Sequence, residues 1–147
     1  MNVPDEIART ATVRWEGDIA RGRGHIDTES GKVSADYSFG TRFSGDPGTN
    51  PEELLAASHA ACFSMALSLA LTRAGHPPRT IDTTARVHLA RAGEGFEIPR
   101  IELRTRVSAP GIDPGAFEEL AQGAKAGCPI SKALAAVPIT LDAKLDP

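Results

Sequence analysis

The amino-acid sequence predicts an α+β fold rather than a doubly wound parallel sheet. Short alternating segments fill the N-terminal third, a long apolar stretch occupies the centre, and strands and helices then follow without regular alternation. A βαβ protein would alternate its strands with helices along the whole chain. The irregular order therefore favours sheets and helices that are segregated along the chain.

The N-terminal third is predicted to be an antiparallel meander. After a loose arm over residues 1–10, strand-like segments cover Thr12–Trp15, Gly24–Glu29 and Lys32–Phe39. They alternate in part between apolar and polar residues, and turns that contain glycine separate them, which is typical of neighbouring antiparallel strands. The turn-rich segment Ser44–Thr49 then leads to the centre of the chain.

A long helix is predicted over Pro51–Ala74. Asn50 can cap its first turn, proline suits the first helical position, and Glu52 complements the helix dipole. Leu54–Leu71 contains no charged residue and no helix breaker, and Gly75 suits the C-terminal end. At 1.5 Å per residue the helix would be about 36 Å long.

This helix is apolar nearly all round, so we expect it to be buried on most sides. It is long enough to raise the possibility of a membrane span. Its alanine and serine content, the presence of His59 and its place between strand-forming segments instead favour the core helix of a soluble protein with no membrane partner.

A globule of this size is only about 35–40 Å across. One subunit can hardly cover such a helix, and we therefore predict a homodimer whose partners bury each other's central helix.

The C-terminal half is predicted to hold a hairpin, two helices and a final strand. The hairpin strands Ile81–Ala90 and Phe96–Ser108 alternate and flank a turn. Proline at the first helical turn marks both helix starts. The remaining predicted elements are Pro114–Ala126, Cys128–Ala136 and Pro138–Leu145.

Length and composition predict a single soluble domain over residues 1–147. Hydrophobic residues make up 41% of the chain and charged residues 24%, which is typical of a globular protein. The net charge of −3 and the aromatic content of 5% argue against a nucleic-acid partner. The N-terminal segment MNVPDEIART lacks the features of a signal peptide, so we expect a cytoplasmic location.

Cys62 and Cys128 are the two cysteines, and two interpretations of them stay open. Burial within the long helix would raise the pKa of Cys62 and leave it inert unless a cation came from elsewhere. Cys128 stands at the predicted start of a helix, where free N–H groups favour a thiolate. From the residues alone, the two are either a reactive pair or buried packing residues.

Other patterns give weak signals. His59 and Cys62 could form half of a zinc site with Cys128 and either His88 or His25, but nothing in the spacing supports that site. We expect His59 to be a hydrogen-bonded core residue instead.

Arg42 and Glu52 have ordinary structural interpretations, as a solvated strand end and a first-turn acid. The segment Gly22–Gly24 lacks the strand–turn–helix context of a dinucleotide-binding loop. A G-x-S-x-G motif, the signature of many serine hydrolases, does not occur in the sequence.

Four longer motifs resemble those of the OsmC/Ohr family of thiol peroxidases. They are TNPEEL at Thr49–Leu54, HAACFSMAL at His59–Leu67, AGCPIS at Ala126–Ser131 and WEGDI at Trp15–Ile19. The resemblance extends from about residue 13 to 145. WEGDI, together with the segment Thr41–Phe43, is closer to the osmotically inducible branch of the family than to the organic hydroperoxide resistance branch.

The resemblance implies an intertwined homodimer in which antiparallel sheets from two chains wrap around paired long central helices. It implies an antioxidant enzyme that reduces organic hydroperoxides to alcohols, without a cofactor or metal, at a site on the dimer interface. It also implies a dithiol reductant, of the lipoyl type in that family.

The resemblance also assigns residues. Cys62 matches the peroxidatic cysteine, Cys128 the resolving cysteine, and Glu52 the acid of the Pro-Glu-Glu motif. Arg42 matches the site arginine of one branch, whereas the other branch draws its arginine from an earlier strand, where Arg21 is the candidate.

These roles agree with the chemistry of thiols. A guanidinium beside Cys62 would stabilise its thiolate, and a carboxylate such as Glu52 would hold the guanidinium. Glu52 and Cys62 would lie about 15 Å apart along one helix, so we predict a site that combines residues from both subunits.

We expect an apolar wall of Phe63, Met65 and Leu67 to favour alkyl or aryl hydroperoxides over hydrogen peroxide. The alternative function is a non-enzymatic dimeric module that binds a hydrophobic ligand in the interface cleft.

Overall fold

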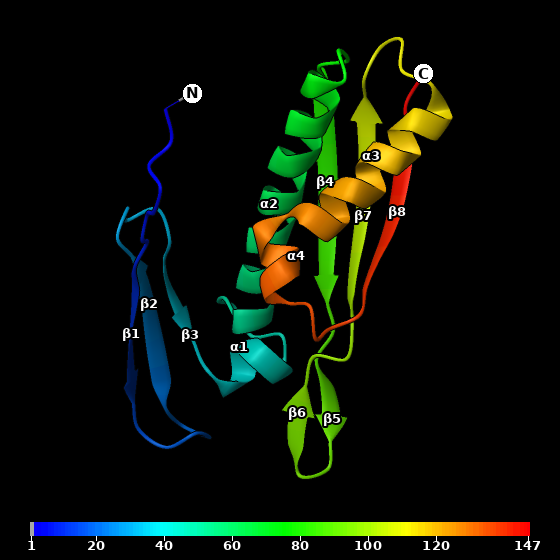
Figure 1. The fold of residues 1–147 in the computed structure, drawn as a ribbon. Helices are drawn as coiled ribbons and strands as arrows, with labels where there is room; N and C mark the ends of the chain where they lie inside the picture. Colours follow the sequence, from blue (N-terminus) through cyan, green and yellow to red (C-terminus); the bar gives the residue numbers. More distant parts are fainter. Residues whose placement is uncertain (1) are drawn as a thin grey trace. The chain divides into compact units, whose positions relative to one another are not determined.

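The computed structural model describes residues 2–147 and confirms the α+β class (Figure 1). The chain forms two compact units, one up to Pro51 and one over Glu52–Pro147. The single domain expected over residues 1–147 stays a prediction.

The first unit contains the predicted meander. Strands β1 (Ala11–Glu16), β2 (Arg23–Thr28) and β3 (Ser34–Tyr37) form an antiparallel sheet in the order β1-β2-β3. Gly24 pairs with Tyr37, and a Cβ atom at this glycine would collide with the tyrosine ring. Glycine is therefore required where the ring crosses the strand.

A short helix, α1 (Phe39–Phe43), replaces the predicted end of the third strand. Ser38 and Thr41 form a capping box: Ser38 Oγ accepts a hydrogen bond from Thr41 N at 3.2 Å, and Thr41 Oγ1 accepts one from Ser38 N at 2.9 Å. These reciprocal bonds stabilise a first helical turn where the sequence pattern suggested a strand. Arg42 consequently lies in a last helical turn and not at a strand end.

The second unit is built on the sheet β4-β7-β8. β4 (Thr80–Val87) and β7 (Ile101–Ser108) are antiparallel, as expected, but β8 (Ile139–Leu145) pairs in parallel with β7. The reason is the connection through α3 (Pro114–Gly127) and α4 (Pro129–Ala133), which returns the chain to the end of the sheet where β7 begins. Parallel neighbours need such a crossover.

The predicted long hairpin is interrupted. β4 and β7 continue beyond a break into the smaller hairpin of β5 (Ala90–Ala92) and β6 (Gly95–Glu97). Pro99 lies in the break before β7 and lacks the N–H that a continuous ladder would need. Gly93, with φ of 58°, makes the turn between β5 and β6.

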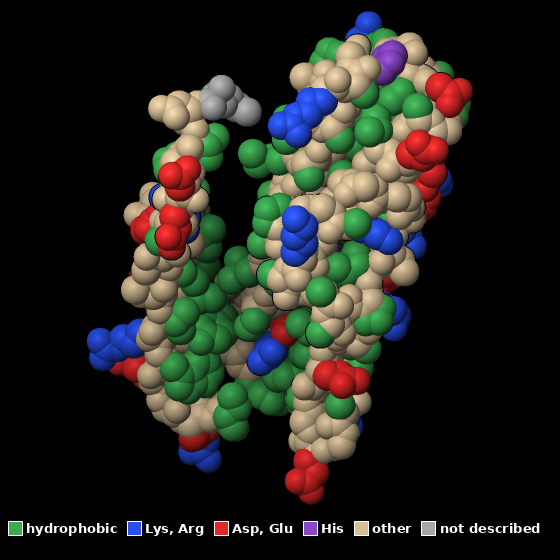
Figure 2. All heavy atoms as spheres, in the orientation of Figure 1, with side chains coloured by type: hydrophobic (Ala, Val, Ile, Leu, Met, Phe, Trp, Pro, Cys, Tyr) green, Lys and Arg blue, Asp and Glu red, His purple; other side chains and the backbone are tan. Residues whose placement is uncertain are grey.

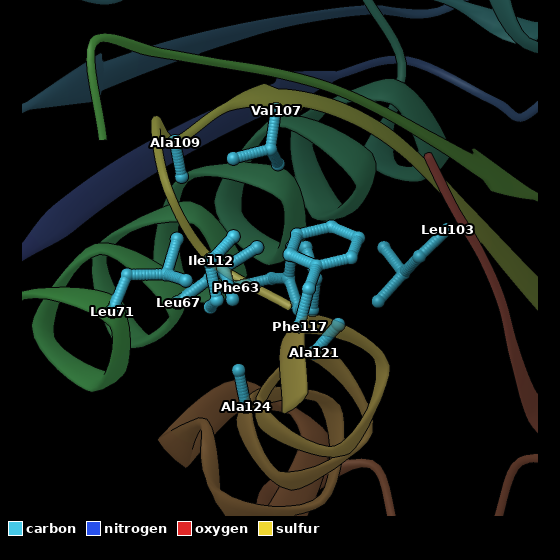
Figure 3. Packing of buried hydrophobic residues seen from close by; sticks show 10 residues of the cluster. All are labelled: Phe63, Leu67, Leu71, Leu103, Val107, Ala109, Ile112, Phe117, Ala121 and Ala124. Carbon is cyan, nitrogen blue, oxygen red and sulfur yellow. The ribbon is translucent and has the colours of Figure 1, made fainter. Parts of the chain in front are cut away.

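The long helix α2 (Pro51–Arg73) begins at the predicted residue and ends one residue early. One of its faces packs on the sheet and on α3 to form the core of the second unit (Figure 3). The fully buried residues of this face recur every four positions: His59, Phe63, Leu67 and Leu71. Three of them, Phe63, Leu67 and Leu71, form one buried cluster with Leu103 and Val107 of β7 and with Phe117, Ala121 and Ala124 of α3.

The rest of α2 is more exposed than predicted within the single chain. Met65 is 75% exposed and Leu69 is 42% exposed, and hydrophobic side chains reach the surface over this helix (Figure 2). Ala57 and Ala61 continue the same face at a spacing of four residues. By length and composition α2 could cross a membrane, but it also supplies the core residues described above.

Candidate functional site

The fold of the second unit brings the two cysteines together. Cys62 lies in the middle of α2, and Cys128 lies at the junction where α3 ends and α4 begins. Their Sγ atoms are 3.0 Å apart, and both are free thiols. The pairing that the sequence left open is therefore possible within one chain.

Cys128 caps the N-terminus of α4 and is fully buried. Its Sγ accepts hydrogen bonds from Ser131 N at 3.4 Å and from Ser131 Oγ at 3.5 Å. Burial acts to raise the pKa of Cys128, but the hydrogen bonds from Cys62, Ser131 and the Ile130 N–H outweigh it, so the pKa is lowered. This agrees with the prediction that the start of a helix favours a thiolate.

Cys62 is partly exposed and has the opposite tendency. Burial raises its pKa most; the Ile130 N–H lowers it, while the hydrogen bond and the charge of Cys128 raise it further. Within these contacts, ionisation is favoured at Cys128 over Cys62. These contacts therefore disfavour ionisation of Cys62, and a cation from elsewhere that would ionise it stays a prediction.

A buried histidine extends the thiol pair. His59 is fully buried, and its Nε2 lies 2.8 Å from Ser131 Oγ. Polar contacts thus run without a break from His59 through Ser131 to Cys128 and Cys62. Burial lowers the pKa of His59, so its neutral form is favoured.

The prediction that His59 is a hydrogen-bonded core residue is confirmed. Over residues 2–147 no group of three or more His, Cys, Asp or Glu side chains is arranged to hold a metal ion, so the zinc hypothesis gains no support. Sequence reasoning gave no role to Ser131. The available signal was its position three residues after the cap Cys128, where a capping side chain receives its hydrogen bond.

The predicted Arg42 and Glu52 lie in different units. Arg42 is exposed in the last turn of α1, with its guanidinium carbon 5.5 Å from the centre of the Phe43 ring. Glu52 is half-buried in the first turn of α2, about 15 Å along the helix from Cys62. Arg21 is exposed in the turn between β1 and β2. The roles of all three stay predictions.

The predicted apolar wall is wrong as drawn from the sequence. Phe63 and Leu67 are fully buried in the core, whereas Met65 is 75% exposed on another face of α2. The reason is helical geometry, since residues two apart point about 160° away from each other. The three side chains therefore cannot line one pocket.

The chain is similar to one protein family and to several known proteins. The family model described as OsmC-like protein matches residues 43–142. Peroxiredoxin OsmC of Escherichia coli (strain K12) is 54% identical over 140 residues, which cover 95% of this chain and 97% of that protein. The organic hydroperoxide resistance protein OhrA of Bacillus subtilis (strain 168) is 34% identical over 97 residues, covering 64% of this chain and 66% of that protein. The crystal structure of OhrB from Bacillus subtilis matches with a TM-score of 0.67 and 29% identity, covering 93% of this chain and 98% of that one.

Proposed function

This chain belongs to the OsmC/Ohr family of thiol peroxidases, and we propose that it reduces organic hydroperoxides to alcohols through Cys62 and Cys128. The family match and the names of its relatives, peroxiredoxin and organic hydroperoxide resistance protein, support a cysteine peroxidase. The single observation that carries the proposal is the 3.0 Å separation of the two sulfur atoms in one chain.

In the first step, the thiolate of Cys62 attacks the terminal oxygen of the hydroperoxide. A sulfur–oxygen bond forms as the peroxide oxygen–oxygen bond breaks, and the alkoxide leaves and takes a proton to give the alcohol. Cys62 is oxidised to a sulfenic acid. Cys62 suits this role because it is the more exposed of the two thiols.

In the second step, Cys128 attacks the sulfenic acid. The sulfur–sulfur bond forms, the sulfur–oxygen bond of Cys62 breaks, and the oxygen leaves as water. A dithiol reductant then reopens the disulfide by thiol–disulfide exchange, becoming a disulfide itself. A reducing, cytoplasmic location would supply such a dithiol, of the lipoyl type or another.

Arg42 is the proposed cation that ionises Cys62, with Arg21 as the alternative. A guanidinium close to the sulfur would offset the raised pKa of Cys62 and steady the charge that develops on the peroxide oxygens. Glu52 would orient the guanidinium with paired hydrogen bonds.

We further propose a homodimer. The exposed α2 face of Ala57, Ala61, Met65 and Leu69, which we call the apolar α2 face, supports it because a large exposed apolar helix face is costly in water. Pairing this face with its copy would also let a second chain contribute the arginine or Glu52 to the site.

Thiol titration tests the proposed function. Reduced protein is treated with one equivalent of cumene hydroperoxide, and free thiols are counted before and after. We expect both thiols of each chain to disappear, one alcohol to form per chain, and an intrachain disulfide to be found by peptide mass mapping. Unchanged thiols and unreacted hydroperoxide would contradict the proposal and favour a non-enzymatic module that binds a hydrophobic ligand.

A further inference from the structure

We propose that His59 is a positioning residue for the resolving step, because it directs the hydroxyl proton of Ser131 toward the sulfur of Cys128. This inference rests on the proposed resolving role of Cys128. It concerns three side chains that the fold brings together from α2 and from the first turn of α4: His59, Ser131 and Cys128.

The Ser131 hydroxyl has one proton and two neighbours that could receive it. Its Oγ lies 2.8 Å from His59 Nε2 and 3.5 Å from Cys128 Sγ. If the histidine nitrogen accepts the proton, the hydroxyl has none left for the sulfur. If the nitrogen is protonated and donates, the hydroxyl proton is free to point at Cys128.

The surroundings of the imidazole favour the second arrangement. His59 Nδ1 is buried and has no hydrogen-bond partner among residues 2–147. A proton on Nδ1 would be an orphaned buried N–H group, which folded proteins rarely tolerate. The neutral ring therefore keeps its proton on Nε2 and donates it to Ser131 Oγ.

The position of His59 also indicates a role other than packing. It occupies the end of the buried stripe whose other members are Phe63, Leu67 and Leu71. An apolar residue would fill this position without the cost of burying a polar ring. The imidazole instead forms a hydrogen bond through Nε2 to Ser131, the residue that contacts Cys128.

The hydrogen bond from His59 to Ser131 affects the second step of the proposed reaction, in which Cys128 attacks the sulfenic acid of Cys62. Cys128 must be a thiolate to form a bond with the sulfenic sulfur of Cys62, while the leaving hydroxyl oxygen takes a proton from solvent and departs as water. Ser131 stabilises that thiolate with its N–H at 3.4 Å and its O–H at 3.5 Å. Loss of the His59 donor would let the hydroxyl turn away and would weaken the thiolate.

The first test measures the pKa of Cys128 without any peroxide. In a Cys62→Ser background Cys128 is the only thiol, and the ultraviolet absorbance of its thiolate is followed against pH. His59→Leu removes the donor, Ser131→Ala removes the hydroxyl, and His59→Gln keeps an N–H donor of similar reach. We expect His59→Leu and Ser131→Ala each to raise the pKa by about one unit, and His59→Gln to leave it within about 0.3 units.

An unchanged pKa in both His59→Leu and Ser131→Ala would overturn the proposal, as would a His59→Gln variant that behaves like His59→Leu. Circular dichroism and urea unfolding establish that each variant is folded. If His59→Leu does not fold, Ser131→Ala and His59→Gln decide the matter, because the first must shift the pKa and the second must not.

A second test uses the otherwise natural chain and single-turnover kinetics with cumene hydroperoxide. We expect His59→Leu to slow the closure of the disulfide about tenfold, and to slow the formation of the sulfenic acid much less. Equal slowing of both steps would contradict a positioning role at Cys128. If neither the natural chain nor any variant consumes hydroperoxide, the proposed function fails. The pKa measurement still tests the effect of His59 on Cys128 in that case.

Discussion

Cys62 Sγ and Cys128 Sγ lie 3.0 Å apart although 66 residues separate them in the chain. One sulfur is carried by a helix that packs on the sheet, and the other by the junction between the two short C-terminal helices. The contacts around the two thiols shift their pKa values in opposite directions: the pKa of Cys128 is lowered and that of Cys62 is raised. In the proposed mechanism, contacts within its own chain therefore favour the thiolate of the resolving Cys128, whereas the peroxidatic Cys62 would depend on a cation beyond these contacts.

The two cysteine variants should fail in different ways. Cys62→Ser should abolish turnover, because the remaining thiol, Cys128, is fully buried and out of reach of the hydroperoxide. Cys128→Ser should allow one round of reduction and leave a sulfenic acid at Cys62 that dimedone traps and peptide mapping locates. Repeated turnover of Cys128→Ser at the natural rate, with the same dithiol, would show that resolution does not need Cys128.

The parts of the fold that were predictable from the sequence are those set by local chemistry. The start of α2 follows from Pro51 and the acids of its first turn, and its end from Gly75, whose φ of 84° suits a helix C-terminus. The helix α1 was missed because a capping box over Ser38 and Thr41 decides it within an alternating segment. The parallel direction of β8 depends on where the crossover delivers the chain, which no local pattern states.

The site was predictable only in part, for a similar reason. The identity of the cysteines came from motifs, and the cap position of Cys128 came from Pro129. The contact between His59 and Ser131 joins elements 72 residues apart, so spacing could not reveal it. Hydrophobicity alone also placed Met65 with Phe63 and Leu67, although the period of the helix puts them on different faces.

Arg42→Ala should raise the pKa of Cys62 by at least about one unit and lower the rate with cumene hydroperoxide at neutral pH about tenfold or more, since the thiolate fraction falls. The pH dependence of alkylation by iodoacetamide in a Cys128→Ser background measures this pKa. Arg21→Ala, in a turn of the same unit, should change neither value. The opposite ranking of the two variants would move the role to Arg21.

Met65→Glu should convert the proposed dimer into monomers and reduce peroxidase activity, because a carboxylate in a dry apolar interface costs about several kcal/mol. The Met65 side chain is 75% exposed in the single chain, so the substitution should have little effect on the folding of each subunit. Sedimentation velocity gives the oligomeric state. Thr140→Glu, which places the same charge on an exposed position of β8, is the matched control and should stay dimeric and active. A monomeric Met65→Glu protein with full activity would refute a site shared between subunits.

The buried His59 should make the free energy of unfolding depend on pH below neutrality. Burial lowers its pKa from 6.5 in the folded state, so between the two pKa values the unfolded chain binds more protons. The stabilisation is fully present above pH 6.5 and is lost as the pH falls toward the folded pKa. His59→Gln should therefore flatten the pH dependence of the free energy of unfolding below pH 6.5, as measured by urea unfolding.

His25 provides a contrasting control, because its hydrogen bond to Asp36 raises its pKa. Its contribution to stability is present below pH 6.5 and is lost as the pH rises through the pKa of the folded state. His25→Gln should thus act above 6.5, and a His59→Gln curve parallel to that of the natural chain below 6.5 would show that the histidine is not held neutral.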